Sequence, residues 1–201
     1  GLALEYGALE DRLELKRAQL QHGEALLMVG EATRARAIFC GVLRDVSETE
    51  WPPELGQQMI AHARAAHAQA LAACGLWLAA RSETHDAVLD IYELPAAQLV
   101  EHSDLFAFYA LTCLRVGDPA SAAQILEQAL RGLGELIQQA TPDIPAALSE
   151  STVQLHVMRA EILAEYLDQV GPALQAYDAA LDLTLDPRDR AALSGAKGVT
   201  L

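Results

Sequence analysis

Apolar residues recur at intervals of three and four along most of the chain, which is the period of an amphipathic α-helix. The first stretch runs from Leu13 to Val29, and a second follows Gly30 and continues through Phe39 to Leu43. A glycine between two periodic stretches is typical of a turn, because glycine lacks the Cβ atom that restricts the backbone. These residues therefore predict two helices that fold back on each other as a hairpin.

The same pattern of two helical stretches around a turn occurs three more times. Prolines separate these units, at Pro52-Pro53, at Leu94-Pro95 and in the segment 141–145, where a proline interrupts or begins a helix. The predicted hairpins cover about residues 5–46, 54–93, 103–139 and 146–186, with turns at Gly30, Gly75, Gly117 and Gly171-Pro172. We also expect a short linker helix at 96–102 and a flexible tail at 195–201. The chain is thus predicted to form one all-α domain over residues 1–201.

Composition favours the same fold class and limits the cellular setting. Of the residues, 52% are hydrophobic, and alanine and leucine, which are strong helix formers, dominate them, whereas aromatic residues make up only 5%. The chain has neither the apolar run of about 18 residues that a membrane helix needs nor the pattern of a signal peptide. We therefore expect a cytoplasmic protein. Because the sequence begins with Gly1 rather than Met, we expect it to belong to a longer protein.

The residues around the turns recur in type at identical spacing. This six-position frame places a small residue and a larger one before the turn glycine, then small, large and small residues after it. The first three frames consist of Gly23, Leu26, Gly30, Ala35, Phe39 and Val42, then Ala68, Leu71, Gly75, Ala80, Thr84 and Ala87, then Ala110, Cys113, Gly117, Ala122, Leu126 and Ala129. The fourth hairpin keeps Ala173, Tyr177 and Ala180, but Ala160 and Leu163 on its first helix are displaced by one residue.

This frame resembles the tetratricopeptide repeat family, whose second helix has an A-x-x-x-F/Y-x-x-A pattern. The closest matches are Ala35-x-x-x-Phe39 and Ala173-x-x-x-Tyr177-x-x-Ala180. The resemblance covers about residues 10–187, but Gly30 and Gly75 are 45 residues apart, whereas the family repeats every 34 or so. Such longer repeats resemble those of bacterial signalling and regulatory proteins in this superfamily. The resemblance implies a right-handed α-solenoid of about four antiparallel hairpins; an ordinary helical bundle is the alternative.

No sequence pattern indicates catalysis or a cofactor. The chain contains no Gly-rich phosphate loop, dinucleotide fingerprint, HExxH or nucleophile elbow, so we expect no enzyme and no cofactor. His62 and His67 are five residues apart, a spacing that does not place both on one helix face, and we expect no metal site.

The three cysteines, Cys40, Cys74 and Cys113, lack the paired spacing of a zinc site or a disulfide framework. We interpret them as small buried apolar residues. A reactive thiol would need a nearby histidine or a helix N-terminus, and nothing in the sequence places one there.

In a solenoid of this type, the first helices of the hairpins line a concave face that can bind a peptide or a partner helix. The candidate contacts are the positions beside the frame on these helices, and each is equally compatible with plain solvent exposure. These candidates are Arg17, Glu24, His62, Gln69, Asp104, Leu111 and Arg115. The net charge of −14 disfavours nucleic acid and favours a basic or neutral partner. The sequence contains no Asn, so the Asn-containing carboxylate clamp of some family members is not expected.

We therefore expect a non-catalytic protein-interaction module that binds a peptide or partner helix on its concave face, within a larger regulatory or assembly protein. The alternative is a small-molecule or signal-peptide sensor domain of a transcriptional or signalling regulator. No binding to nucleic acid or membrane is expected from this segment. Homodimerisation through an apolar end of the solenoid stays open.

Overall fold

The computed structural model describes residues 2–49, 51–92, 102–139, 146–184 and 186–200. Within these ranges the regular secondary structure consists of nine α-helices, so the described chain is all-α, as predicted. None of these helices combines the length and apolar character needed to cross a membrane. The chain divides into two compact units, Gly1–Leu94 and Pro95–Leu201. Apart from His102, the predicted linker helix lies outside the described residues.

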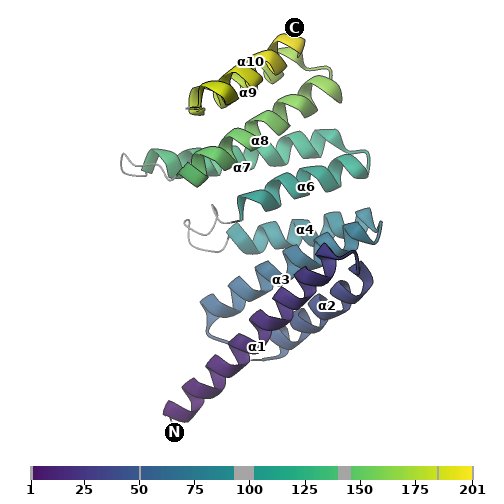
Figure 1. Cartoon of the computed structure of the whole chain (residues 1–201), viewed down its shortest axis with the longest axis vertical. Helices are drawn as coiled ribbons and strands as arrows, with labels where there is room; N and C mark the ends of the chain where they lie inside the picture. Colours follow the sequence, from purple (N-terminus) through teal and green to yellow (C-terminus); the bar gives the residue numbers. More distant parts are fainter. Residues whose placement is uncertain (1, 50, 93–101, 140–145, 185, 201) are drawn as a thin grey trace. The chain divides into compact units, whose positions relative to one another are not determined.

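The first unit contains four described helices, and each runs antiparallel to the helix before it (Figure 1). Their bounds are α1 Leu2–Met28, α2 Ala32–Glu48, α3 Pro53–Ala73 and α4 Trp77–Tyr92. Each helix packs on the next one in the sequence, and α1 also touches α3. Pro53 is the first residue of α3, where the missing N–H removes no intrahelical hydrogen bond. The first two hairpins therefore form close to their predicted bounds.

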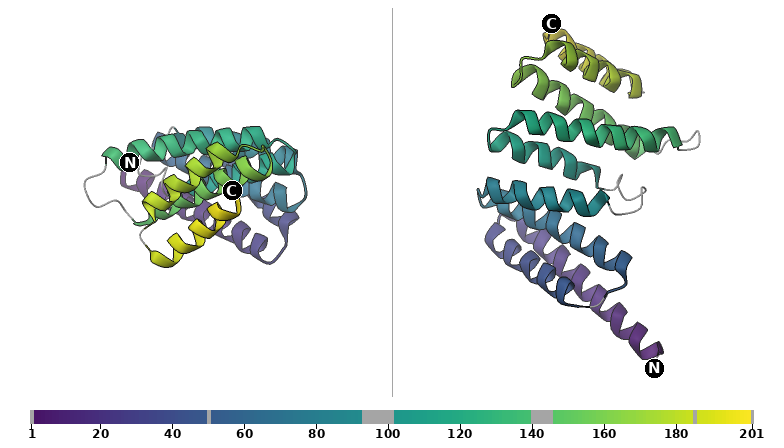
Figure 2. Two further views of the ribbon diagram at one scale, coloured as in Figure 1. Left: turned by 90° about the horizontal axis from the view of Figure 1, so that it is seen from above. Right: turned by 180° about the vertical axis from the view of Figure 1, so that it is seen from behind.

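The second unit contains five described helices, which also follow one another in antiparallel order (Figure 2). Their bounds are α6 Ser103–Arg115, α7 Pro119–Gln139, α8 Ala146–Glu165, α9 Val170–Leu183 and α10 Pro187–Thr200. Again each helix packs on its sequence neighbour, and α6 also touches α8. The segment 141–145, where the sequence predicts a break, lies outside the described residues.

Three of the hairpin turns have the same backbone geometry. Gly30, Gly75 and Gly117 have φ angles of 83°, 77° and 82°, in the left-handed region that only glycine adopts without strain. In the first turn, the N–H of Glu31 donates to the carbonyl of Leu26 at 2.8 Å, and that of Gly30 donates to Leu27 at 3.0 Å. These two bonds satisfy carbonyls that the end of α1 leaves without helical partners. The glycine turns thus end their helices as predicted.

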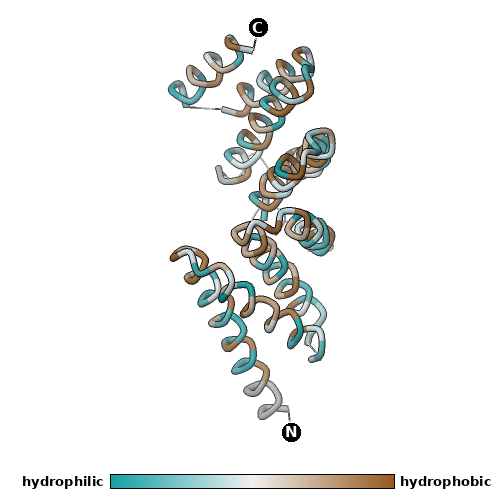
Figure 3. The backbone as a smooth tube through the Cα atoms, turned by 90° about the vertical axis from the view of Figure 1, so that its right-hand side faces the viewer, coloured by the Kyte–Doolittle hydropathy of each residue, from teal (hydrophilic) through white to brown (hydrophobic). Residues whose placement is uncertain are grey.

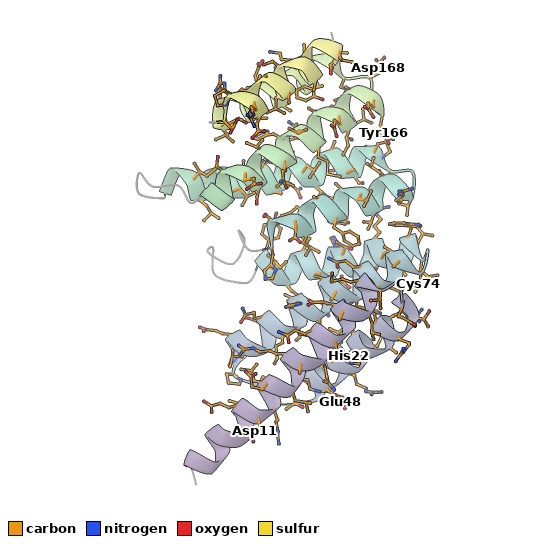
Figure 4. The ribbon with its side chains drawn as sticks, in the orientation of Figure 1. Asp11, His22, Glu48, Cys74, Tyr166 and Asp168 are labelled. Atoms are coloured by element: carbon orange, nitrogen blue, oxygen red, sulfur yellow. The ribbon has the colours of Figure 1, made fainter. Side chains whose placement is uncertain are left out.

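The fourth turn differs from the prediction of a turn at Gly171-Pro172. Helix α8 ends at Glu165 and α9 begins at Val170, so Gly171 and Pro172 lie in the first turn of α9. The left-handed residue is Asp168, with a φ angle of 53°, and Figure 4 labels it in the turn with Tyr166. Proline suits this position because the first N–H groups of a helix have no intrahelical partner. The predicted turn was therefore placed too late in the chain.

This fourth turn is also one residue longer, which explains the displaced frame. In the first three turns, the closing hydrogen bond joins residues five apart, as between Glu31 and Leu26. In the fourth, the N–H of Gln169 donates to the carbonyl of Leu163, six residues earlier, at 2.8 Å. Leu163 therefore takes the place of Leu26 despite its shift along the sequence.

The frame positions form the packing seam, the set of buried positions along which the helices of each unit touch. Apart from the turn residues, every frame residue is buried in all four hairpins, including Ala160 and Leu163. Figure 3 shows hydrophobic and hydrophilic stretches alternating along the helices, as expected when one face packs and the other meets solvent. The repeated spacing in the sequence thus corresponds to repeated burial in the structure.

The expected flexible tail is wrong for residues 195–200, which instead belong to α10. This helix is held by contacts that the sequence does not place next to it. Lys197 forms an ion pair with Asp178 of α9 at 2.5 Å, and Ala196 packs on a cluster that includes Tyr177. These contacts offset the low helix propensity of Gly195 and Gly198.

Candidate functional site

Four of the predicted contact residues lie in the first unit. A hydrogen bond joins Oε1 of Glu24, on α1, to Nε2 of His62, on α3, at 2.7 Å, and both side chains are more than two-fifths exposed. Arg17 is exposed and pairs with Glu14, one helical turn earlier, at 3.0 Å. Gln69 is exposed on α3. The fold therefore brings Glu24 and His62 together.

The other three predicted residues lie on α6 in the second unit. Asp104 is exposed in the first turn of the helix, where a carboxylate is favoured by the partial positive charge of the free N–H groups. Arg115 is exposed in the last turn, where a cation is favoured in the same way. Leu111 is half-buried on the same helix. The two charged residues thus have a structural role as well as a proposed contact role.

The second unit also contains a cleft of about 470 Å³ that the sequence does not reveal. Its walls come from α8, from the end of α9 and from α10 with the segment that precedes it. We call it the α8–α10 cleft, and its lining residues are Ser149, Glu150, Val153, Gln154, Leu183, Thr184, Asp186, Asp189, Ala192 and Leu193. This volume lies within the range of about 300 to 1,000 Å³ that is usual for ligand pockets.

The α8–α10 cleft combines an apolar lining with acidic groups. Val153, Leu183 and Leu193 supply half-buried apolar surface. Glu150 and Asp189 are exposed, and neither forms an ion pair within the described residues. The charged residues in its lining are all acidic, namely Glu150, Asp186 and Asp189, and the lining includes no lysine or arginine.

Side-chain hydrogen bonds hold the end of α9 and the start of α10 beside the cleft. The carboxylate of Asp186 accepts the backbone N–H of Arg188 at 2.7 Å, which caps the start of α10. The guanidinium of Arg190 donates to the carbonyls of Leu181 and Thr184, at 3.0 and 3.2 Å, which caps the end of α9. Both ends of the α9–α10 connection are therefore fixed by side chains.

The α8–α10 cleft was not predicted from the sequence, because the residues of α10, which form one of its walls, lie after the last predicted hairpin. Asp186-Pro187 ends one helix and also begins the next, with Pro187 as the first residue of α10. Asp186 followed by Pro187 and by Asp189 is a helix-start pattern that could have predicted α10.

His156 is a titratable residue of the second unit whose pKa is shifted mainly by burial. It lies on α8, and its Nδ1 atom is buried without a hydrogen-bond partner among the described residues. Burial lowers the pKa of His156, and the positive charge of Arg159 lowers it further. Arg159 itself pairs with Glu127 of α7 at 3.0 Å. The neutral imidazole is therefore the form that the folded protein favours.

We expect the neutral side chain of His156 to contribute to the free energy of unfolding, and this contribution to be lost as the pH falls. The folded-state pKa lies below the unfolded value of about 6.5, so between the two values the unfolded chain binds the proton more readily. The free energy of unfolding should therefore decrease as the pH is lowered through this interval. Urea unfolding at a series of pH values checks this, and the difference between the wild type and His156→Gln isolates the histidine. Parallel curves for the two proteins would contradict the prediction.

A second constellation that the sequence did not predict lies in the first unit. The structure places the imidazole of His67, on α3, against the thiol of Cys40, on α2, at 3.2 Å. Cys40 is exposed and Cys74 is half-buried, whereas Cys113 is buried. The prediction of three buried cysteines is therefore correct for Cys113, wrong for Cys40, which also has a histidine beside it, and wrong for Cys74, which is only partly buried.

The described residues contain no group of three or more histidine, cysteine or acidic side chains with the geometry to hold a metal ion. Comparison of the chain with models of protein families, with curated proteins and with solved structures found no match.

Proposed function

We propose that this chain is a non-catalytic peptide-binding module, and that the α8–α10 cleft binds a segment of a partner protein with an apolar residue flanked by lysine or arginine. The observation that carries this proposal is an apolar cleft bordered by Glu150 and Asp189, which form no ion pair among the described residues, in a chain with a net charge of −14.

The chemistry of the cleft favours a basic peptide over an acidic or purely apolar one. An apolar side chain that covers Val153 and Leu193 removes apolar surface from water, which is favourable by about 25 cal/mol per Å². A lysine or arginine beside it would lie near Glu150 or Asp189, where opposite charges attract. Apolar burial thus supplies affinity, and charge selects the partner and speeds its approach.

The proposal includes the repeat architecture and the residues predicted from it. The repeated burial of the frame supports the inference that the hairpins are units of a tetratricopeptide-like solenoid. Arg17, Glu24, His62 and Gln69 in the first unit remain proposed partner contacts. Asp104, Leu111 and Arg115 remain proposed contacts in the second unit. Self-association through a solenoid end also remains a prediction, which analytical ultracentrifugation checks.

The proposal is tested by selecting peptides from a random library displayed on phage, followed by titration of the selected peptides. We expect enrichment of peptides with a large apolar residue beside lysine or arginine. Glu150→Lys should raise their Kd about tenfold, equivalent to about 1.4 kcal/mol, because it places a like charge where the basic residue binds. Fluorescence anisotropy of the labelled peptide measures the Kd.

The matched control is Glu135→Lys. Glu135 is an exposed residue of α7 outside the cleft, so this variant changes the net charge by the same amount. Because Glu135 does not line the cleft, its replacement removes no contact with a bound peptide, and the Kd should change less than twofold. Equal effects of the two variants would show general charge attraction instead of recognition in the cleft. Failure to enrich any basic, apolar peptide would contradict the proposed partner.

The second candidate function is a small-molecule sensor, because about 470 Å³ is also sufficient for a small ligand. A ligand that binds only the folded state must raise the melting temperature. A thermal-shift screen with cationic metabolites such as polyamines separates the two candidates. A shift that Glu150→Lys abolishes and Glu135→Lys retains would favour the sensor, whereas peptide enrichment without any such shift favours the peptide-binding module.

A further inference from the structure

Three helices of the first unit bring together a thiol, an imidazole and a carboxylate. Nε2 of His67 lies 3.2 Å from Sγ of Cys40, and Nδ1 of the same ring lies 3.5 Å from Oε1 of Glu83. Cys40 belongs to α2, His67 to α3 and Glu83 to α4. The order of the groups is that of a nucleophile, a base and a group that orients the base.

The positions of these three residues are set by the packing seam. Each directly adjoins a fully buried frame residue: Cys40 follows Phe39, His67 precedes Ala68, and Glu83 precedes Thr84. Because the neighbouring residues are held in the core, the three side chains leave their helices at fixed points along one edge of the seam.

His67 lies between the thiol of Cys40 and the carboxylate of Glu83. Its side chain is only 12% exposed, and Nδ1 is buried without a hydrogen-bond partner among the described residues. Glu83 is the carboxylate that faces this nitrogen, and its side chain is 23% exposed. A proton on Nδ1 leaves Nε2 free to accept the proton of Cys40, and the carboxylate stabilises the imidazolium that results.

We propose that Cys40 is a base-activated thiol that is reversibly modified by low-molecular-weight disulfides. Cys40 is an exposed residue, so a small reagent can approach it. The α8–α10 cleft and the smaller cavity beside Trp51 are lined by other residues, so the arrangement favours modification of the thiol over catalysis on a bound substrate.

The reaction is a thiol–disulfide exchange. His67 Nε2 takes the proton of the Cys40 thiol, and the resulting thiolate attacks one sulfur of the disulfide. A sulfur–sulfur bond forms between Cys40 and that sulfur as the bond within the reagent breaks. The second sulfur leaves as a thiolate and takes the proton from the imidazolium. Cys40 is thereby oxidised to a mixed disulfide, and half of the reagent is reduced to a free thiol.

The proposal is tested with the neutral disulfide dithiodipyridine, because the net charge of −14 would repel an anionic reagent. Mass spectrometry of peptides follows each cysteine separately, in the folded chain and in urea. Cys40 should react about five- to tenfold faster in the folded chain than in urea. The base increases the fraction of thiolate, which is only a few per cent for an unactivated thiol near pH 7. The gain in rate is smaller than the gain in thiolate, because a more acidic thiol is also less nucleophilic. Cys113, which is buried, should react only after unfolding.

His67→Gln tests the base directly and should lower the rate at folded Cys40 to that measured in urea. His22→Gln is the matched control, because His22 is an exposed histidine of α1, labelled in Figure 4, and should leave the rate unchanged. Circular dichroism checks that both variants are folded. A rate at Cys40 in the wild type that is no faster in the folded chain than in urea would overturn the proposal. A folded His67→Gln variant that retains the wild-type rate would do the same.

Discussion

Replacing Gly23 with alanine is expected to destabilise the first unit by about 2 kcal/mol, although the same change inside a helix usually stabilises a protein. An added Cβ atom at Gly23 would lie 2.6 Å from Cζ of Phe39 and closer still to Cε1 of the same ring. Phe39 is fully buried in the core cluster of this unit, so its ring cannot move away without disturbing that cluster. Overpacking therefore outweighs the gain in helix propensity.

Gly41→Ala is the matched control for this prediction. Gly41 lies on α2, and a Cβ atom added there meets nothing within 4 Å. The substitution should therefore stabilise the protein by about 0.5 to 1 kcal/mol through helix propensity alone. Urea unfolding of both variants measures the free energies. A Gly23→Ala variant as stable as Gly41→Ala would contradict the close packing of α1 on Phe39.

The repeated frame also predicts a compensating change. In the third hairpin, the position of Gly23 is occupied by Ala110 and that of Phe39 by Leu126, and both are fully buried. Phe39→Leu should therefore make room for an alanine at position 23. We expect the double variant to be more stable than the sum of the single changes predicts, with a coupling of about 1 to 2 kcal/mol. Strictly additive changes would show that the two positions do not pack together.

Replacing Leu126 with alanine should destabilise the second unit by about 3 kcal/mol. Leu126 lies on α7 and is fully buried, so the change removes buried apolar surface and leaves a cavity. Hydrogen exchange followed by mass spectrometry should show faster exchange in α6 and α7, since these helices pack on each other.

Two further variants make this second prediction specific to the packing seam. Val199→Ala changes a side chain that is 89% exposed on α10 and should alter the free energy of unfolding by less than about 0.5 kcal/mol. Thr84 occupies the frame position of Leu126 in the second hairpin, and its hydroxyl already donates to Ala80 of the same helix at 2.6 Å. Thr84→Ala should therefore cost only about 1 kcal/mol. A loss below about 1 kcal/mol for Leu126→Ala would contradict its place in the seam.

Most of the fold could be predicted from the sequence because its determinants are local. Helix period depends on residues three and four apart, and a turn glycine such as Gly75 is needed by the backbone at that position. The frame joins these signals, and apart from its turn residues the structure buries every member of it. The hairpin at 103–139 accordingly forms within its predicted bounds.

The prediction is wrong where a short sequence pattern is compatible with two local structures. Gly171-Pro172 is a turn pattern, but a proline also fits the first turn of a helix, and Asp168 took the left-handed position instead. Gly195 and Gly198 suggested a loose tail, but contacts from Lys197 and Ala196 to the preceding helix hold α10 in place. In both cases, the choice was made by packing between helices.

The all-α class, the glycine turns and the residues of the packing seam follow from the amino-acid sequence alone, because each depends on spacing within a few helical turns. Which side chains from separate helices meet depends on the tertiary structure. The α8–α10 cleft joins Glu150 to Asp189, and the activated thiol joins Cys40 to His67, 27 residues later. Such contacts depend on the rotation and spacing of separate helices, which side-chain packing across the seam sets and which no local pattern encodes.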